Sequence, residues 1–355
     1  MIFAVILLVL LFISIFGNFA QLISQTLTFN SGFKGGITRD IGPRLEECVV
    51  EDHDAANKIA IVRVEGIITD QTIDQAGNSM VDIIRAQLNR AKKDNHVKAV
   101  LLKVNSPGGE VMASDEIKKA VAKFQLDEPG EPGEPARHGK PVICSMGSLA
   151  ASGGYYVSAP SRWIVANPLT ITGSIGVLLH SWNYRGLMDK VGLAPVTYKS
   201  GKFKDMLSGD RSTNEIPVEE RAMVQGLIDE TYQQFKGVVA DGRKAAHEKN
   251  QKEGRALIDG WANYADGRVL SGQKALDYGF VDELGDFSDA VKTAKKIANI
   301  RNANLVEYRV RYDISDFFRM FGQSESAHTI KLDLGMEFPK LRAGELYFLS
   351  PTFVN

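Results

Sequence analysis

The sequence is poor in the residues that build disulfide frameworks and metal sites. Its 355 residues include two cysteines, Cys48 and Cys144, and six scattered histidines. Two cysteines are too few for a disulfide framework or a zinc site. The histidines have neither the HExxH pattern nor another paired-ligand spacing. The sequence therefore argues against a metal enzyme, and we expect no cofactor.

The sequence also lacks an excess of charge of either sign. Lys and Arg number 42 and Asp and Glu number 43, so no overall field attracts nucleic acid, and none is expected as a partner. At the amino terminus, charge is missing altogether, because no charged side chain precedes Lys34. The apolar run from Met1 to about Ile23 is long enough to cross a hydrocarbon core of about 30 Å as a helix.

We interpret residues 1–24 as a transmembrane anchor that makes the protein single-pass. A cleaved signal peptide is the alternative. The run has no basic residues at its start, is longer than the apolar core of a typical signal peptide, and is not followed by a clean small-x-small cleavage site. These features favour the anchor. The charges that follow are mixed in sign, so they barely specify orientation. Residues 25–57 are rich in glycine and then charged, and we interpret them as a linker.

Strand and helix patterns alternate after this linker. β-branched residues predict a strand at Lys58–Ile68, and an apolar run predicts a buried strand at Lys98–Val104. Apolar residues at helical spacing predict helices at 79–93 and 114–124. This alternation predicts an α/β domain over residues 58–300, with a parallel sheet and helical crossovers.

The remainder of the chain continues the pattern. Three further elements are expected: a strand at 141–146, a long helix from Pro217 to about Ala246, and a helix at Ser288–Ala298. Residues 127–140 contain two Pro-Gly-Glu units and are expected to form a solvated surface loop. Residues 301–355 are expected to contain a strand near Asn304–Val310, followed by a tail with scattered aromatic residues.

A run of small residues follows the strand at 141–146 and ends at Ser152-Gly-Gly-Tyr-Tyr156. A serine that enters a helix can present its hydroxyl at the edge of a cleft. It needs a base to become a nucleophile, either a histidine or a lysine held neutral by burial or nearby positive charge. No histidine stands in a triad signature, whereas three lysines cluster at 199–204. Gly108 and Gly109 could supply N–H donors for an oxyanion. A purely structural Gly/Ser turn remains the alternative for this stretch alone.

Five short motifs together resemble the signal peptide peptidase A (SppA) family of membrane-associated serine–lysine proteases. They are Asn105-Ser-Pro-Gly-Gly109, Ser148-x-x-Ala151-Ser-Gly-Gly-Tyr-Tyr156, Thr172-Gly-Ser-Ile-Gly176, Lys199-Ser-Gly-x-x-Lys-Asp205 and Asp266-Gly-Arg-Val269. Each motif is weak, but their order and rough spacing match over about residues 58–300. The family is similar in fold to the Clp protease and crotonase superfamily. The resemblance therefore implies repeated ββα units with helical crossovers, preceded by the transmembrane helix.

The resemblance assigns the two catalytic roles by position. Ser152, directly before Gly-Gly-Tyr-Tyr, matches the nucleophile. Lys204, directly before Asp205, matches the general base, with Lys199 and Lys202 as the alternatives in the same cluster.

Three further residues match supporting positions in the family. Gly109 matches the oxyanion donor, together with the amide of Gly153. Ser174 matches the position that hydrogen-bonds the lysine amine, and an acceptor hydroxyl there would orient a neutral amine towards the nucleophile.

The chain carries one catalytic repeat, which resembles the short form of the family. In that form a ring of protomers completes the sites, and serine and lysine come from neighbouring subunits. We therefore expect a homo-oligomer such as an octamer. The resemblance implies an extracytoplasmic protease domain that cleaves signal peptide remnants and other extended hydrophobic peptides at the membrane.

Two other functions are possible for such a chain. A crotonase-type acyl-CoA enzyme also stabilises an oxyanion with backbone N–H donors, but it needs neither a serine–lysine pair nor an anchor. A non-catalytic membrane scaffold needs none of Ser152, Lys204, Ser174 and Gly109. The joint presence of these four residues favours the serine endopeptidase.

Overall fold

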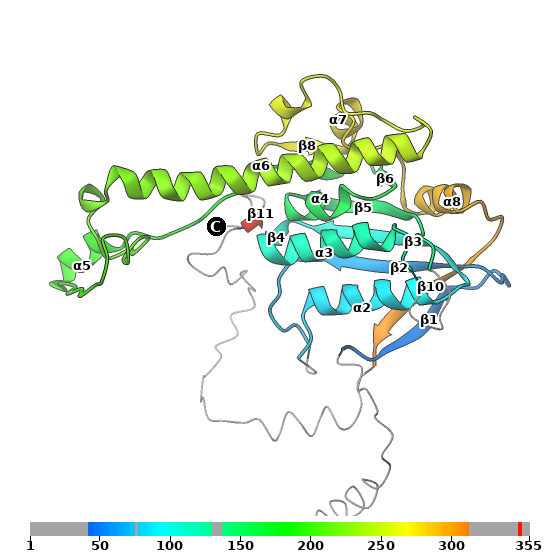
Figure 1. Cartoon of the computed structure of the whole chain (residues 1–355), viewed down its shortest axis with the longest axis horizontal. Coiled ribbons are helices and arrows are strands. Elements are labelled where there is room, and N and C mark those ends of the chain that lie inside the picture. The colour runs from blue at the N-terminus through cyan, green and yellow to red at the C-terminus, as the bar shows by residue number, and fades with distance from the viewer. Residues whose placement is uncertain (1–41, 75–76, 130–136, 312–346, 350–355) are drawn as a thin grey trace, which may run out of the picture. The chain divides into compact units, whose positions relative to one another are not determined.

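Figure 1 shows the chain as a computed structural model, which describes residues 42–74, 77–129, 137–311 and 347–349. The predicted anchor and most of the carboxyl-terminal tail lie outside the described residues. None of the helices in the described ranges is both long and apolar enough to cross a membrane.

A sheet of nine strands forms the centre of the domain (Figure 1). The order is β1-β10-β2-β3-β5-β6-β9, and β7 pairs with both β5 and β8. Pairing is parallel from β10 to β9, whereas β1 with β10 and β7 with β8 are antiparallel. The strands are β1 (Leu45–Glu51), β2 (Lys58–Glu65), β3 (Val97–Ser106), β5 (Val142–Ala151), β6 (Trp163–Ala166), β7 (Ile171–Gly173), β8 (Val269–Ser271), β9 (Glu283–Leu284) and β10 (Asn304–Val310). The predicted α/β class with a largely parallel sheet is confirmed.

Helices cover both faces of this sheet. They are α2 (Met80–Lys93), α3 (Val111–Phe124), α4 (Gly153–Ser158), α5 (Arg185–Val191), α6 (Val218–Lys249), α7 (Gly272–Asp277) and α8 (Phe287–Ile297). Because successive strand residues point to opposite faces, β3 sends Val100 and Leu102 into the core under α2 and α3, and Leu101 into the core under α8. Burial on both faces explains why β3 is a continuous apolar run.

The helices at 79–93, 217–246 and 288–298 are confirmed within a few residues. Helix α3 begins at Val111, three residues before the predicted start. The hydroxyl of Ser114 donates to the Glu110 carbonyl oxygen at 2.8 Å, so Ser114 lies in the first turn and does not cap the helix.

The linker assigned to residues 25–57 differs from the structure in its last part. Residues Leu45–Glu51 form β1, which pairs antiparallel with β10 at the edge of the sheet. An edge strand leaves one row of backbone groups unpaired and commonly carries charged side chains. The three glutamates of β1 made this segment resemble a charged linker, so the strand was not predicted.

Helix α6 has two dissimilar halves. Phe235, Val239, Arg243 and Ala246 are buried in its second half, whereas Glu220 is the buried residue near its start. In Figure 1 the first half extends beyond the sheet and carries α5 at its far end. We refer to residues 180–217 as the arm. The amide of Tyr184 donates to the Gly209 carbonyl at 2.9 Å, which holds the two parts of the arm together.

Candidate active site

Ser152 occupies a strained turn between β5 and α4. Its backbone has φ 55° and ψ −118°, a conformation that non-glycine residues rarely adopt. The Ser152 amide donates to the Gly173 carbonyl at 2.8 Å, which ties the turn to β7. The side chain is buried, and its hydroxyl has no hydrogen-bond partner within the described part of the chain. A buried hydroxyl without a partner is costly and calls for a functional explanation.

A glycine pair lies directly against this turn. Gly108 and Gly109 begin the short strand β4 (Gly108–Glu110), which follows β3. A Cβ atom on Gly153 would lie 3.0 Å from Gly108 Cα and 3.1 Å from Gly109 N, so no side chain fits between these backbones. Gly108 also has φ +103°, which favours glycine. The backbones of Gly109 and Gly153, the two residues predicted as oxyanion donors, therefore lie close together, and Gly153 directly follows Ser152.

Ser174 lies beside Ser152 because of strand register. Strands β5 and β7 are parallel, and Ala151 pairs with Gly173. Ser152 and Ser174 follow these paired residues, so they stand at neighbouring positions at the carboxyl ends of the two strands. Ser174 is buried, has φ 49°, and donates its amide to the Arg268 carbonyl at 2.7 Å. The structure thus brings together four of the five predicted site residues.

Lys204 is not joined to this group. It lies in the arm, its side chain is exposed, and Nζ makes no hydrogen bond or ion pair with the residues that the structure describes. The other two lysines of the cluster are paired. Lys199 Nζ lies 2.7 Å from both carboxylate oxygens of Asp205, and Lys202 Nζ lies 3.4 Å from Glu219 Oε1. Among the three lysines of the cluster, Lys204 is therefore the one whose amine is not engaged by a carboxylate of the described residues.

A short strand from the tail was not predicted from the sequence. Strand β11 (Tyr347–Leu349) pairs antiparallel with β4, with Phe348 opposite Gly109. Tyr347 also exchanges backbone hydrogen bonds of 3.1 and 3.2 Å with Leu178. An extended segment therefore lies along the edge of β4, beside the glycine amides. The scattered aromatic residues of the tail fitted either a docking segment or a partner-binding strip, and composition did not decide between them.

The Phe348 side chain fills an aromatic pocket under this strand. Its ring centroid lies 4.8 Å from that of Tyr156 on α4 and 4.7 Å from that of Phe235 on α6. The Tyr156 hydroxyl donates to Asp115 Oδ1 at 2.9 Å. Burial, together with this bond to a carboxylate, raises the pKa of Tyr156. Tyr156 therefore remains a neutral wall of the pocket.

A strained serine at a strand–helix turn, close to the backbone of two glycines, is an arrangement that many serine hydrolases share. Comparison with known proteins gives the family. The profile of peptidase family S49 matches residues 134–301. A protein of Enterococcus faecium named for signal peptide peptidase SppA is 35% identical over 269 residues, which are 75% of this chain and 71% of that protein. A protease of Synechocystis is 37% identical over 68% of this chain and 75% of its own length.

The chain belongs to the SppA family of S49 peptidases, and it is a protease by this membership. Protease 4 of Haemophilus influenzae is also similar, at 34% identity over 72% of this chain. The match covers 38% of that relative, so the chain corresponds to little more than a third of its length.

Proposed function

We propose that this chain is a membrane-anchored serine endopeptidase that uses Ser152 as nucleophile and Lys204 as general base. Gly109 and Gly153 supply the oxyanion donors, and Ser174 orients the lysine amine. The observation that carries this proposal is the Ser152 hydroxyl, which is buried, lacks a hydrogen-bond partner among the described residues, and sits on a strained backbone beside two glycine amides.

The proposed reaction proceeds through an acyl-enzyme. Ser152 Oγ attacks the scissile carbonyl carbon while its proton passes to Lys204 Nζ. The oxyanion accepts hydrogen bonds from the Gly109 and Gly153 amides. Collapse breaks the C–N bond, and the lysine proton goes to the departing amine. Water then attacks the ester carbonyl carbon and gives a proton to the lysine. When this second tetrahedral intermediate collapses, the C–O bond to Ser152 breaks and the lysine returns the proton to Ser152 Oγ.

We propose that the two halves of the site come from neighbouring copies in a ring such as an octamer. Two observations support this. Lys204 has no contact with Ser152 within the chain, and the arm that carries it exposes large apolar side chains. These are Trp182, Leu187, Val191, Leu193, Val196 and Tyr198, each more than half exposed. Several large exposed apolar side chains on one segment are typical of protein interfaces.

The edge of β4 supports an extended peptide as the substrate. Strand β11 lies there with main-chain pairing, and adding a strand to a sheet edge is a common mode of peptide recognition. The name of the Enterococcus faecium relative favours signal peptides as substrates. The aromatic pocket under Phe348 fits apolar side chains. A transmembrane helix at residues 1–24, an extracytoplasmic protease domain and the Clp/crotonase type of ββα repeat complete the proposal.

The first experiment separates catalysis from scaffolding. A fluorophosphonate probe should label the wild-type protein at Ser152, and Ser152→Ala should lose both labelling and cleavage of a quenched apolar peptide. Lys204→Ala should be inactive, whereas Lys199→Ala and Lys202→Ala should be only impaired. Peptide cleavage by purified Ser152→Ala would refute the proposed nucleophile. Loss of activity in Lys202→Ala alone would move the base to that residue.

The second experiment tests whether one site spans two copies. Ser152→Ala and Lys204→Ala chains are each expected to be inactive. In a mixed ring, a site regains both groups when a Lys204→Ala chain supplies the serine and a Ser152→Ala chain supplies the lysine. Random mixing in equal amounts should therefore restore about one quarter of wild-type activity. If no activity returns after subunit exchange has been verified by labelled chains, each site lies within one copy.

A further inference from the structure

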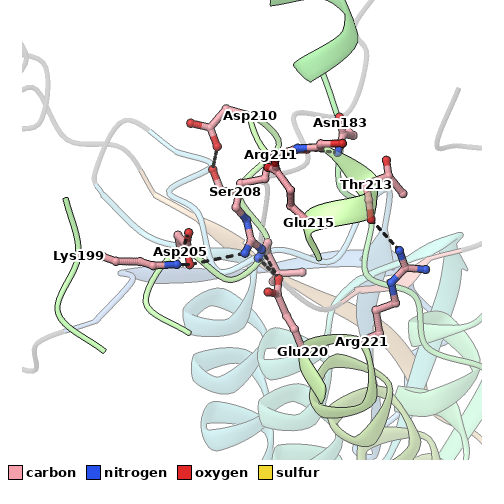
Figure 2. A network of polar contacts seen from close by, with 12 residues as sticks. Asn183, Lys199, Asp205, Ser208, Asp210, Arg211, Thr213, Glu215, Glu220 and Arg221 are labelled. Atoms are coloured by element: carbon pink, nitrogen blue, oxygen red, sulfur yellow. Dashed lines mark hydrogen bonds and ion pairs between the residues drawn. The ribbon is translucent and has the colours of Figure 1, made fainter. Parts of the chain in front are cut away.

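A chain of ion pairs runs through the arm next to Lys204 (Figure 2). The carboxylate of Asp205 accepts from Lys199 Nζ at 2.7 Å on both oxygens, and Asp205 Oδ1 lies 3.6 Å from Arg211 Nη1. Arg211 in turn pairs with Glu220 on α6. Glu220 Oε1 also accepts the Leu207 amide at 3.1 Å. These contacts tie the segment after Lys204 to α6 at two points, Leu207 and Arg211.

These ion pairs are sheltered from water, although the arm is largely exposed. The side chains of Glu220, Arg211 and Asp205 are 3%, 14% and 12% exposed. Exposed ion pairs contribute little because water screens them, whereas removing one partner of a buried pair leaves a charge unpaired, which is costly. The Lys199 ammonium holds the pKa of Asp205 below its ordinary value, and the Arg211 guanidinium does the same for Glu220. Both carboxylates are therefore ionised at neutral pH.

The segment after Lys204 that these ion pairs hold in place is itself strained. Leu207, three residues after Lys204, has φ 66°, an uncommon conformation for a residue with a side chain. Such conformations persist where surrounding contacts fix them. The bond from the Leu207 amide to Glu220 is one such contact.

The ion pairs also determine which amine the Asp205 carboxylate meets. Asp205 is the residue next to Lys204, yet its oxygens are occupied by Lys199 and Arg211. Other charged groups around this segment are Lys202, which pairs with Glu219 on α6, and Asp210, which accepts from the Ser208 hydroxyl and lies near Arg211. Glu215 and Arg221 lie further along, bonded to the Ser212 amide and the Thr213 carbonyl (Figure 2).

We infer that the chain Lys199–Asp205–Arg211–Glu220 fixes the backbone that carries Lys204 and keeps the neighbouring carboxylate away from its amine. Asp205, Arg211 and Glu220 are then positioning residues for the general base. This inference rests on the proposed role of Lys204.

The first test compares two adjacent glutamates on α6. Glu220→Gln keeps the shape of the side chain but weakens the bonds to Arg211 and the Leu207 amide. We expect kcat for a quenched apolar peptide to fall about 10- to 100-fold, the order expected when a catalytic group is displaced by about 1 Å, with KM little changed. Glu219→Gln is the matched control, because its carboxylate is 65% exposed and bonds Lys202 at a distance of 3.4 Å. It should keep wild-type kcat. Equal kcat values for the two variants would overturn the inference.

The second test uses the pH profile, which a merely structural role would not move. Lys199→Met removes the ammonium group that lies closest to the Asp205 carboxylate. Lys199 is partly exposed, so the substitution leaves the packing of the arm intact. The released carboxylate then stabilises the ammonium form of Lys204, so the acid limb of kcat/KM should move to higher pH by about one unit. The double variant Lys199→Met/Asp205→Asn removes that carboxylate and should return the limb to its wild-type position.

The outcomes separate this inference from the proposed function. An acid limb that stays in place in Lys199→Met, while Lys204→Ala is inactive, refutes the role of the ion pairs and leaves the base intact. Full activity in Lys204→Ala would instead refute the proposed base, and the inference with it.

Discussion

The buried Ser152 hydroxyl makes a prediction that can be tested by stability alone. In the assembled protein, the proposed partner of Ser152 Oγ is Lys204 of a neighbouring copy. In a Lys204→Ala background that partner is gone, and the hydroxyl is left buried without a hydrogen bond. An unsatisfied buried hydroxyl costs about 1–3 kcal/mol. Adding Ser152→Ala to this background should therefore raise the free energy of unfolding, by about 1 kcal/mol after a small loss of packing.

The same substitution in the wild-type protein should be close to neutral or slightly destabilising, since it removes a satisfied bond of about 1 kcal/mol. The double-mutant cycle should thus give a coupling of about 1–2 kcal/mol between the two residues. In the Lys204→Ala background, Ser152→Gly should raise the free energy of unfolding more than Ser152→Ala does, because glycine also relieves the strain at φ 55°. Urea titrations at one fixed protein concentration measure these differences, since association also contributes to stability.

Ser158, the last residue of the helix that follows Ser152, is the matched control. Its hydroxyl is equally buried but donates to the Gly154 carbonyl at 2.7 Å. Ser158→Ala should lower the free energy of unfolding by about 0.5–1.5 kcal/mol in either background. If Ser152→Ala in the Lys204→Ala background is as destabilising as Ser158→Ala, the Ser152 hydroxyl has another partner and the reasoning fails.

Three further predictions concern other parts of the chain. If β11 competes with substrate for the edge of β4, Phe348→Ala should weaken the docking of β11 by removing its contacts with Tyr156. The rate of peptide cleavage should then rise about tenfold for each 1.4 kcal/mol of docking free energy lost. An unchanged rate in steady-state kinetics would show that β11 does not compete with substrate. Burial lowers the pKa of Lys140 from 10.5 to about 8, so the unfolded chain binds more protons between these values. The free energy of unfolding, relative to that of Lys140→Met, should therefore rise from pH 8 to 10.5; urea titrations that show a fall would contradict this. Burial raises the pKa of the Cys144 thiol to about 12, whereas Cys48 is partly exposed, so a maleimide should add once to the folded protein and twice in urea, as counted by mass spectrometry; two additions in the folded state would refute the packing of β5.

The part of the site that could be predicted from sequence lies at the ends of neighbouring strands. Parallel strands bring their carboxyl ends to one edge of a sheet. A motif after β5 and another after β7 therefore had to meet, and Ser152 lies beside Ser174 for this reason. The glycine pair at Gly109 follows β3, the neighbour of β5 in the sheet. Local motifs were sufficient for these residues because regular pairing completes the geometry.

Other features depend on contacts that no local pattern encodes. The bond from Arg211 to Glu220 forms because α6 turns back along the arm, and neither residue belongs to a motif. Strand β11 has three residues, too few for a periodic pattern, and it pairs with β4 more than 200 residues earlier in the chain. The choice of Lys204 within its cluster came from the family resemblance. The structure adds that its two rivals are already paired with Asp205 and Glu219.

The contact among Gly108, Gly109 and Gly153 has a consequence for selectivity. The glycines themselves carry no side chain, so the part of a peptide that lies against them meets their main chain. Main-chain groups are common to every protein, and such a surface would bind an extended segment without regard to its sequence. Discrimination then has to come from outside the glycines: from the aromatic pocket beneath the strand, and from how few polypeptides arrive unfolded at the edge of β4. Folded proteins are protected because their backbone groups are already paired within their own sheets and helices.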